Sequence, residues 1–252
     1  MDNLRISTIT ALSGFDTNIE LKLLYDNIVI DDKIKFIQWG INNTKGKSNK
    51  INKRKIKKKE VFYNQVTIHY YLNKIINIKI FNNGQIQMTG LKEVEHGQIV
   101  VESICNLIKD INNQIKDNNN KIVDNKDFKV NKYKIVLINS DFDIKYNVNR
   151  DILHRHLINM NIFSSYEPLI YPGVNIKYFY NNIYNDGICK CTNICKGKGN
   201  AIGDGNCKRI TIAVFKSGKI IITGANSFNQ LLETYNFINN LMMINKEKFN
   251  LK

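Results

Sequence analysis

Two stretches of the chain repeat one pattern of apolar and polar positions. The first is IKIFNNGQIQMTG (Ile78–Gly90) and the second is IAVFKSGKIIITG (Ile212–Gly224), with Ile, Phe, Gly, Ile, Thr and Gly at the same steps. In each stretch, alternating segments flank a glycine, which predicts two antiparallel strands joined by a tight turn. A repeat of this length, followed by a helical pattern, indicates two homologous halves rather than a solenoid of short units.

The periodicity around each hairpin predicts the remaining elements. In the first half we expect strands at Leu4–Thr10 and Tyr63–Tyr70, a short apolar piece around Ile34–Trp39, and helices at Thr17–Ile28 and Glu93–Ile108. In the second half we expect strands at Tyr133–Ser140 and Gly173–Tyr180, an extended segment at Phe163–Pro168, and helices at Arg150–Met160 and Phe228–Met243. Each half thus consists of a strand, a helix, several antiparallel strands and a helix, which is an α+β fold.

Polar segments divide this pattern into parts. Residues 112–127 are rich in Asn and Asp and predict a linker between an N-terminal repeat, 1–111, and a C-terminal repeat, 128–252. Each repeat carries an insertion with few apolar residues: a basic one at 42–62 and a Cys-rich one at 181–208. The basic run KGKSNKINKRKIKKK is either a solvated loop or an arm that contacts phosphates.

The net charge of the chain indicates what kind of partner it binds. The 252 residues carry a formal net charge of +15, which favours a polyanionic partner such as nucleic acid. The start, MDNLRIST, lacks the basic and apolar regions of a signal peptide, and no apolar run approaches the roughly 20 residues of a membrane helix. We therefore expect an intracellular protein that does not enter membranes.

Five cysteines are present, and four of them lie in the second insertion. Cys105 falls on the apolar stripe of a predicted helix and is expected in the core. The other four follow the spacing C-x-C-x3-C-x11-C, at Cys189, Cys191, Cys195 and Cys207. They are either free surface thiols or the ligands of a structural zinc ion, which could stiffen a loop without a core of its own.

The repeat, the charge and the turn-adjacent rings together resemble the TATA-box-binding protein family. The most specific match is FSSYEPLIYPG (Phe163–Gly173) with IAVFKSGKIIITGA (Ile212–Ala225), and RISTIT (Arg5–Thr10) matches more loosely. The resemblance implies a saddle: two pseudo-symmetric repeats join their strands into one curved antiparallel sheet with helices on the convex face. It further implies a monomer that binds and bends A/T-rich or TATA-like promoter DNA through the minor groove.

The resemblance also implies the cellular role. Family members nucleate a transcription initiation complex with general transcription factors and RNA polymerase, and they need no cofactor. The expected site of action is the nucleus, or a cytoplasmic site of viral transcription if the chain comes from a large DNA virus. The four histidines form no evident triad or metal pair, and the sequence contains no phosphate loop or nucleophile elbow, so we expect no catalysis.

The DNA-contacting residues follow from the same resemblance. Minor-groove proteins, of which the TATA-box-binding protein is the standard example, insert apolar wedges between base steps. The implied wedges are Phe81 with Tyr63 in the first repeat and Phe215 with Tyr171 in the second, with Phe62 and Phe36 as alternatives to Tyr63. The implied contacts to base edges are Ala213, Ile221, Thr223, Ile6, Thr89, Lys79 and Gln87.

Some positions depart from the family pattern. Lys79 and Gln87 replace apolar residues, and Leu4 and Leu137 align with the two central Asn residues of the family. These changes shift the expected preference toward A·T-rich deformability. They also leave open a second interpretation, a scaffold of the initiation complex that binds DNA weakly. In the loop that contacts a basal transcription factor, Glu167 is kept, whereas a second acidic position holds Leu169.

Overall fold

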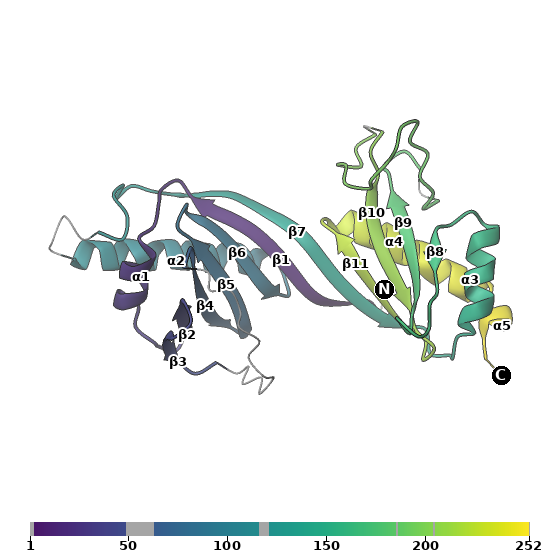
Figure 1. The fold of residues 1–252 in the computed structure, drawn as a ribbon, viewed down its shortest axis with the longest axis horizontal. Coiled ribbons are helices and arrows are strands. Elements are labelled where there is room, and N and C mark those ends of the chain that lie inside the picture. The colour runs from purple at the N-terminus through teal and green to yellow at the C-terminus, as the bar shows by residue number, and fades with distance from the viewer. Residues whose placement is uncertain (1–2, 49–62, 116–120, 185, 204, 252) are drawn as a thin grey trace. The chain divides into compact units, whose positions relative to one another are not determined.

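The computed structural model describes residues 3–48, 63–115, 121–184, 186–203 and 205–251 (Figure 1). These residues form two compact units. The N-terminal unit is Ile9–Val136, and the C-terminal unit combines Met1–Thr8 with Leu137–Lys252. The division therefore falls within two long strands, β1 (Arg5–Phe15) and β7 (Val130–Asp143), rather than within residues 112–127.

The N-terminal unit contains an antiparallel sheet with the strand order β3-β2-β4-β5-β6-β1. Its further elements are α1 (Leu21–Asn27), β2 (Ile34–Trp39), β3 (Asn43–Gly46), β4 (Gln65–Leu72), β5 (Lys74–Phe81), β6 (Gln85–Leu91) and α2 (Val94–Gln114). The first repeat hairpin is thus β5–β6, as the alternating pattern predicts. Helix α2 contacts β4 and β6 and lies behind the strands in Figure 1.

The C-terminal unit repeats this plan with the strand order β7-β11-β10-β9-β8. Its further elements are α3 (Arg150–Asn159), β8 (Ser164–Ser165), β9 (Val174–Tyr180), β10 (Lys208–Val214), β11 (Lys219–Ala225), α4 (Phe228–Ile244) and α5 (Lys246–Phe249). The second repeat hairpin is β10–β11, and α4 contacts β9 and β11. Helices α3 and α4 begin where side chains cap them: Asn149 accepts the N–H of Ile152, and Ser227 accepts that of Gln230.

The core of each unit lies between one sheet face and its long helix. Helix α2 buries a stripe at helical spacing, consisting of Val100, Val101, Ile104, Cys105 and Ile108. The expected core position of Cys105 is confirmed.

Helix α2 continues beyond Ile108 because Ile111 and Asn112 are also buried, and the Asn112 side chain forms hydrogen bonds with backbone atoms of Ile122 and Val123. Among the described residues, no helix has the length and apolar character needed to cross a membrane.

The first part of the basic insertion differs from the flexible loop expected there. Asn43–Gly46 pairs with β2 as strand β3. The ammonium group of Lys45 lies 2.7 Å, 2.8 Å and 3.2 Å from the carbonyl oxygens of Tyr25, Asp26 and Ile28, at the end of α1. Lys45 therefore satisfies carbonyls that the helix leaves free. The remaining basic residues, 49–59, lie outside the described residues.

Candidate nucleic-acid interface

Each sheet has a second face, called here the open face, whose side chains alternate with those of the core. On β5, Ile78 and Ile80 are fully buried on the face that packs against the helix. Lys79 and Phe81 alternate with them on the opposite face and are half-buried. In the N-terminal unit this face carries Thr10, Leu12, Thr67, Asn77, Lys79, Phe81, Gln87 and Thr89. In the C-terminal unit it carries Asn139, Asp141, Lys177, Arg209, Thr211, Ala213, Phe215, Ile221 and Thr223.

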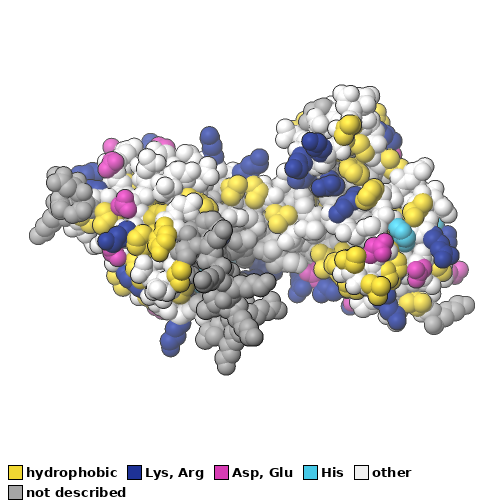
Figure 2. Space-filling model, viewed as in Figure 1, with side chains coloured by type: hydrophobic (Ala, Val, Ile, Leu, Met, Phe, Trp, Pro, Cys, Tyr) yellow, Lys and Arg dark blue, Asp and Glu magenta, His cyan; other side chains and the backbone are white. Residues whose placement is uncertain are grey.

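Figure 2 shows Lys and Arg side chains over the strands of the C-terminal unit, with apolar side chains beside them. On the open face of this unit, the Lys177 ammonium donates a hydrogen bond to Thr211 Oγ1 at 3.0 Å. Burial lowers the pKa of Lys177 below its ordinary value, and the positive charge of Arg209 lowers it further. A cation held beside hydroxyl and methyl groups suits a surface that meets both phosphates and base edges.

Equivalent rows of side chains differ in polarity between the two open faces. In the C-terminal unit, Ala213 pairs with Ile221, which forms an apolar floor. In the N-terminal unit, Lys79 pairs with Gln87 at the matching positions of the repeat. The strand registers therefore place both pairs on open faces. The side chains of the pair in the N-terminal unit can form hydrogen bonds, whereas those of the pair in the C-terminal unit cannot. Thr89 and Thr223 take matching places one step further along.

The two rings of the second repeat lie against each other at the edge of the open face. The Tyr171 and Phe215 centroids are 5.8 Å apart in an edge-to-face arrangement, and Tyr171 is 40% exposed. A Cβ on Gly173 would lie 3.0 Å from the Tyr171 ring and 3.3 Å from that of Phe215, so a larger residue there would crowd both rings. Phe215 starts the turn into β11, in which Gly218 adopts a φ of +83°. That conformation favours glycine.

In the first repeat, Tyr63 lies against a ring that sequence reasoning missed. Its ring is 5.8 Å from that of Trp39, and the Trp39 indole N–H donates to the Tyr63 carbonyl at 3.2 Å. Tyr63 is 59% exposed, and Phe81 is half-buried at the end of β5. The alternative wedge Phe36 is buried against His69, and Phe62 lies outside the described residues. Trp39 is the one tryptophan of the chain, a type enriched where a ring meets a partner.

A shared bulge shows which residues of β1 and β7 are equivalent in the two repeats. In β1, Ile9 pairs with Leu91 and Thr10 with Thr89, so Gly90 is skipped. In β7, Ile138 pairs with Ala225 and Asn139 with Thr223, so the equivalent glycine, Gly224, is skipped in the same way. Ile9 therefore matches Ile138, and the residue that matches Leu137 is Thr8. Leu4 lies before the start of β1 and is therefore not the repeat equivalent of Leu137.

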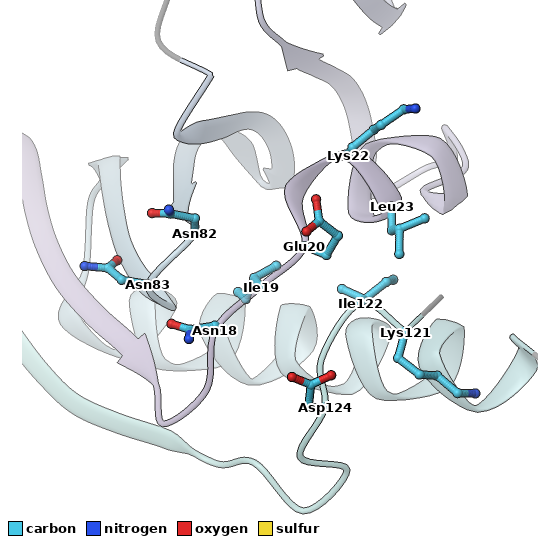
Figure 3. A pocket seen from close by; sticks show the side chains of 10 residues that line it. All are labelled: Asn18, Ile19, Glu20, Lys22, Leu23, Asn82, Asn83, Lys121, Ile122 and Asp124. Atoms are coloured by element: carbon cyan, nitrogen blue, oxygen red, sulfur yellow. The ribbon is translucent and has the colours of Figure 1, made fainter. Parts of the chain in front are cut away.

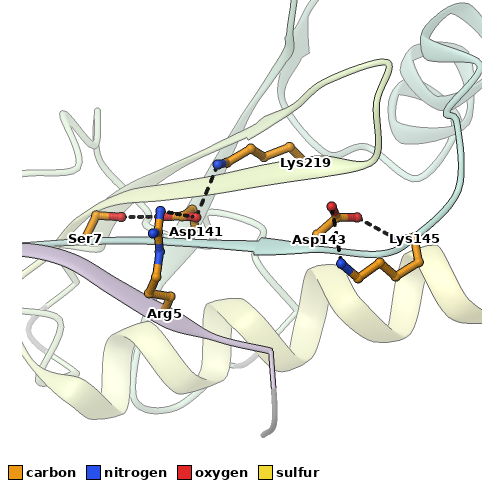
Figure 4. Close-up of polar contacts among 6 residues, drawn as sticks. All are labelled: Arg5, Ser7, Asp141, Asp143, Lys145 and Lys219. Carbon is orange, nitrogen blue, oxygen red and sulfur yellow. Dashed lines mark hydrogen bonds and ion pairs between the residues drawn. The ribbon is translucent and has the colours of Figure 1, made fainter.

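A buried carboxylate occupies the open face of the C-terminal unit (Figure 4). Asp141 receives the Arg5 guanidinium, whose Nη2 is 2.9 Å from each carboxylate oxygen, and Lys219 Nζ at 3.4 Å. Ser7 Oγ also donates to Asp141, and Ile6 lies between Arg5 and Ser7 on β1. Burial raises the pKa of Asp141, but the hydrogen bonds from Ser7 and Arg5 and the charge of Lys219 outweigh it. The net pKa lies below the ordinary value.

Sequence reasoning missed this cluster because its members are far apart in the chain. A cavity of about 380 Å³ adjoins it and is lined by Ser7, Thr8, Asn139, Asp141, Lys219, Ile221 and Thr223. The alternation of SDFD in β7 does contain a signal, since it assigns Asp141 and Asp143 to one face. What the local pattern cannot supply is the identity of their cationic partners.

The segment 163–173 is anchored to α3 and presents apolar side chains outward. Arg150 lies over the Tyr166 ring at 5.1 Å and donates to the Pro172 carbonyl. The Glu167 carbonyl accepts the backbone N–H groups of Ile170 and Tyr171, both at 2.9 Å, which forms a tight turn. This turn leaves Leu169 fully exposed. Glu167 therefore lies in a hydrogen-bonded turn beside two exposed apolar residues, Leu169 and Ile170.

The cysteines of the second insertion also come together. The sulfur atoms of Cys189, Cys191, Cys195 and Cys207 all lie within 4.8 Å of one another. The sequence pattern indicated this cluster through spacing alone.

A further cavity lies beside α1, in the N-terminal unit (Figure 3). It has a volume of about 720 Å³ and is lined by Asn18, Ile19, Glu20, Lys22, Leu23, Asn82, Asn83, Lys121, Ile122 and Asp124. Backbone hydrogen bonds from Ile19 to Asn82 and from Glu20 to Ile122, both 2.8 Å, join its walls. Lys121 donates to the Asn112 carbonyl near the end of α2. These hydrogen bonds hold the segment before α1, the turn after β5 and the segment after α2 against one another.

Comparisons with known proteins agree with this geometry. No protein-family model matches the chain. The chain is 34% identical over 251 residues to a protein of Acanthamoeba polyphaga mimivirus described as TATA-box-binding protein-like. The match covers 95% of this chain and 65% of the relative, so the chain spans just under two thirds of the relative's length. Among solved structures, Methanococcus jannaschii TBP matches with a TM-score of 0.51 and 16% identity, over 97% of this chain and 99% of that one. The expected fold is confirmed.

Proposed function

We propose that this chain, which resembles the TATA-box-binding protein family in sequence and fold, is a transcription initiation factor that binds and bends promoter DNA. Binding takes place through the minor groove at A/T-rich or TATA-like sites, with the open faces of both units on the DNA. The role is non-enzymatic and the chain binds as a monomer. Its partners are general transcription factors and RNA polymerase, in the nucleus or at a cytoplasmic site of viral transcription.

The observation that carries this proposal is the pair of rings at the edge of the open face. Tyr171 and Phe215 are partly exposed, contact each other, and stand beside the apolar floor of Ala213 and Ile221. An exposed pair of this kind suits insertion between base steps, because stacking on bases replaces the water that the rings contact. The cation of Lys177 on the same face suits the phosphates on either side.

The scaffold alternative has its own support. Asp141 places a carboxylate on the open face, and Lys79 with Gln87 removes the apolar floor from the N-terminal unit. An anion opposes approach to phosphates, and a polar row has to give up its water to enter a groove. A chain with these features could keep the partner surface around Glu167 and Leu169 while binding DNA weakly.

One experiment separates the two. An end-labelled A·T-rich duplex and a G·C-rich duplex of the same length are titrated with the full chain, and affinity and end-to-end energy transfer are measured at several salt concentrations. The proposal predicts tighter binding and a shorter end-to-end distance for the A·T-rich duplex. It also predicts that log K falls with log salt at a slope of about −0.9 per phosphate contact. Equal, weak binding without bending would support the scaffold.

A further inference from the structure

The loop between β9 and β10 gathers four sulfur atoms. Cys191 Sγ and Cys207 Sγ lie 3.4 Å apart, and the sulfurs of Cys189 and Cys195 complete a group within 4.8 Å. None of the four is in a disulfide. Tetrahedral zinc with Zn–S bonds of about 2.3 Å needs sulfurs about 3.8 Å apart. The group thus has the composition and approximate spacing of a closed four-thiolate site.

The loop buries little apolar surface of its own. Three of its four isoleucines are largely exposed: Ile183 is 61%, Ile194 94% and Ile202 72% exposed. Ala201 is buried but adopts a φ of +61°, a conformation that costs free energy in a residue other than glycine. A segment that buries so little apolar surface does not offset the entropy of ordering its backbone. A crosslink through the sulfurs would supply that missing stability.

The loop is attached to both strands of the hairpin that it connects. The backbone N–H of Phe179 on β9 donates to the Gly187 carbonyl, and that of Arg209 on β10 donates to the Gly197 carbonyl, both at 2.9 Å. Gly197 fits so closely that a Cβ there would lie 2.4 Å from the Arg209 Cβ. Its N–H also donates to Cys195 Sγ at 3.4 Å, so one sulfur is linked directly to the residue that contacts Arg209.

We propose that Cys189, Cys191, Cys195 and Cys207 bind one structural zinc ion, which holds this loop against the end of the β9–β10 hairpin. All four positions of the tetrahedron are filled by protein, as in sites that stabilise rather than catalyse. Each thiol gives up its proton to solvent when its sulfur binds the ion. This site goes beyond the proposed function and does not depend on DNA binding.

Metal content tests the site directly. The full chain, purified under reducing conditions from zinc-supplemented cells, is expected to hold one zinc per chain by elemental analysis. Cobalt(II) exchanged into the chain should give the intense charge-transfer absorption of thiolate ligands and the visible bands of a tetrahedral ion. Cys191→Ser and Cys195→Ser should each lose both signals, whereas Cys105→Ala, outside the loop, should keep them. A chain with no zinc, with iron in its place, or with disulfides among these cysteines would overturn the proposal.

Hydrogen exchange tests the structural role within the same molecule. Removal of zinc by a chelator should speed exchange of the Phe179 and Arg209 amides at least tenfold, because their acceptors lie in the loop. The Ile222 amide on β11 serves as the internal control, since its strand pairs with β7 and β10 rather than with the loop. Unchanged protection of Phe179 and Arg209 after complete loss of zinc would refute the holding role.

Discussion

The substitution Asp141→Asn provides a sharp test, because stability and DNA affinity should change in opposite directions. The Asp141 side chain is 11% exposed, whereas its partners Arg5 and Lys219 are 68% and 49% exposed. Ion pairs with partners this accessible contribute about 0.2–1 kcal/mol each. Asparagine keeps one oxygen that can accept from Arg5 and Ser7. We therefore expect the free energy of unfolding to fall by about 1–2 kcal/mol at neutral pH.

DNA affinity should rise in the same variant. Loss of the carboxylate removes an anion from the open face and frees Arg5 and Lys219 for phosphates. Each cation that gains a phosphate contact steepens the slope of log K against log salt by about 0.9, or roughly eightfold in affinity near 0.1 M salt. A variant that merely misfolds would lose affinity, so tighter binding cannot come from damage to the fold.

The pH dependence of stability provides a second test of the Asp141 carboxylate. Because the folded-state pKa of Asp141 lies below its unfolded value of about 3.9, its contribution to stability is complete above that pH. It is lost as the pH falls through the folded-state pKa. The stability difference between the native chain and Asp141→Asn should therefore shrink below about pH 4.

The assays are urea unfolding between neutral and acid pH and a salt titration of binding to the A·T-rich duplex. Asp110→Asn, which makes the same charge change on the exposed side of α2, is the matched control and should alter neither result. If Asp141→Asn bound DNA no more tightly than the native chain, with an unchanged salt slope, this reasoning would be refuted.

Two further substitutions test the open faces. Phe215→Ala should weaken binding to the A·T-rich duplex by about 1–3 kcal/mol and reduce bending, because one stacking ring is lost. Phe228→Ala removes an equally large, 42% exposed ring at the start of α4 and should leave binding unchanged, and equal affinities of the two variants would contradict the wedge role. Lys79→Val, which restores an apolar residue beside Gln87, should make the salt slope shallower by about 1 while unfolding stays within about 0.5 kcal/mol. An unchanged slope would show that Lys79 does not contact phosphates.

The hairpins and helices follow from local patterns and were predictable. Strand β2 spans Ile34–Trp39, the residues of a short apolar piece in the sequence. Both repeat hairpins form at their predicted turns, where Gly84 and Gly218 have positive φ. Helix ends were less predictable, since α2 gains its last turn from packing against a segment beyond the helix. The cysteine cluster was also visible in the spacing, because its four cysteines are close in sequence.

The amino-acid sequence by itself determined the duplicated plan and the placement of rings beside turns, because hairpin and helix patterns depend on neighbours within a few residues. The excess of positive charge follows from composition alone. Only the tertiary structure decided which charges meet and which residues are equivalent. Arg5 and Asp141 are 136 residues apart, and the match of Thr8 with Leu137 depends on bulges at Gly90 and Gly224. Strand pairing creates such contacts, and its register is set by long-range hydrogen bonds that no local pattern contains.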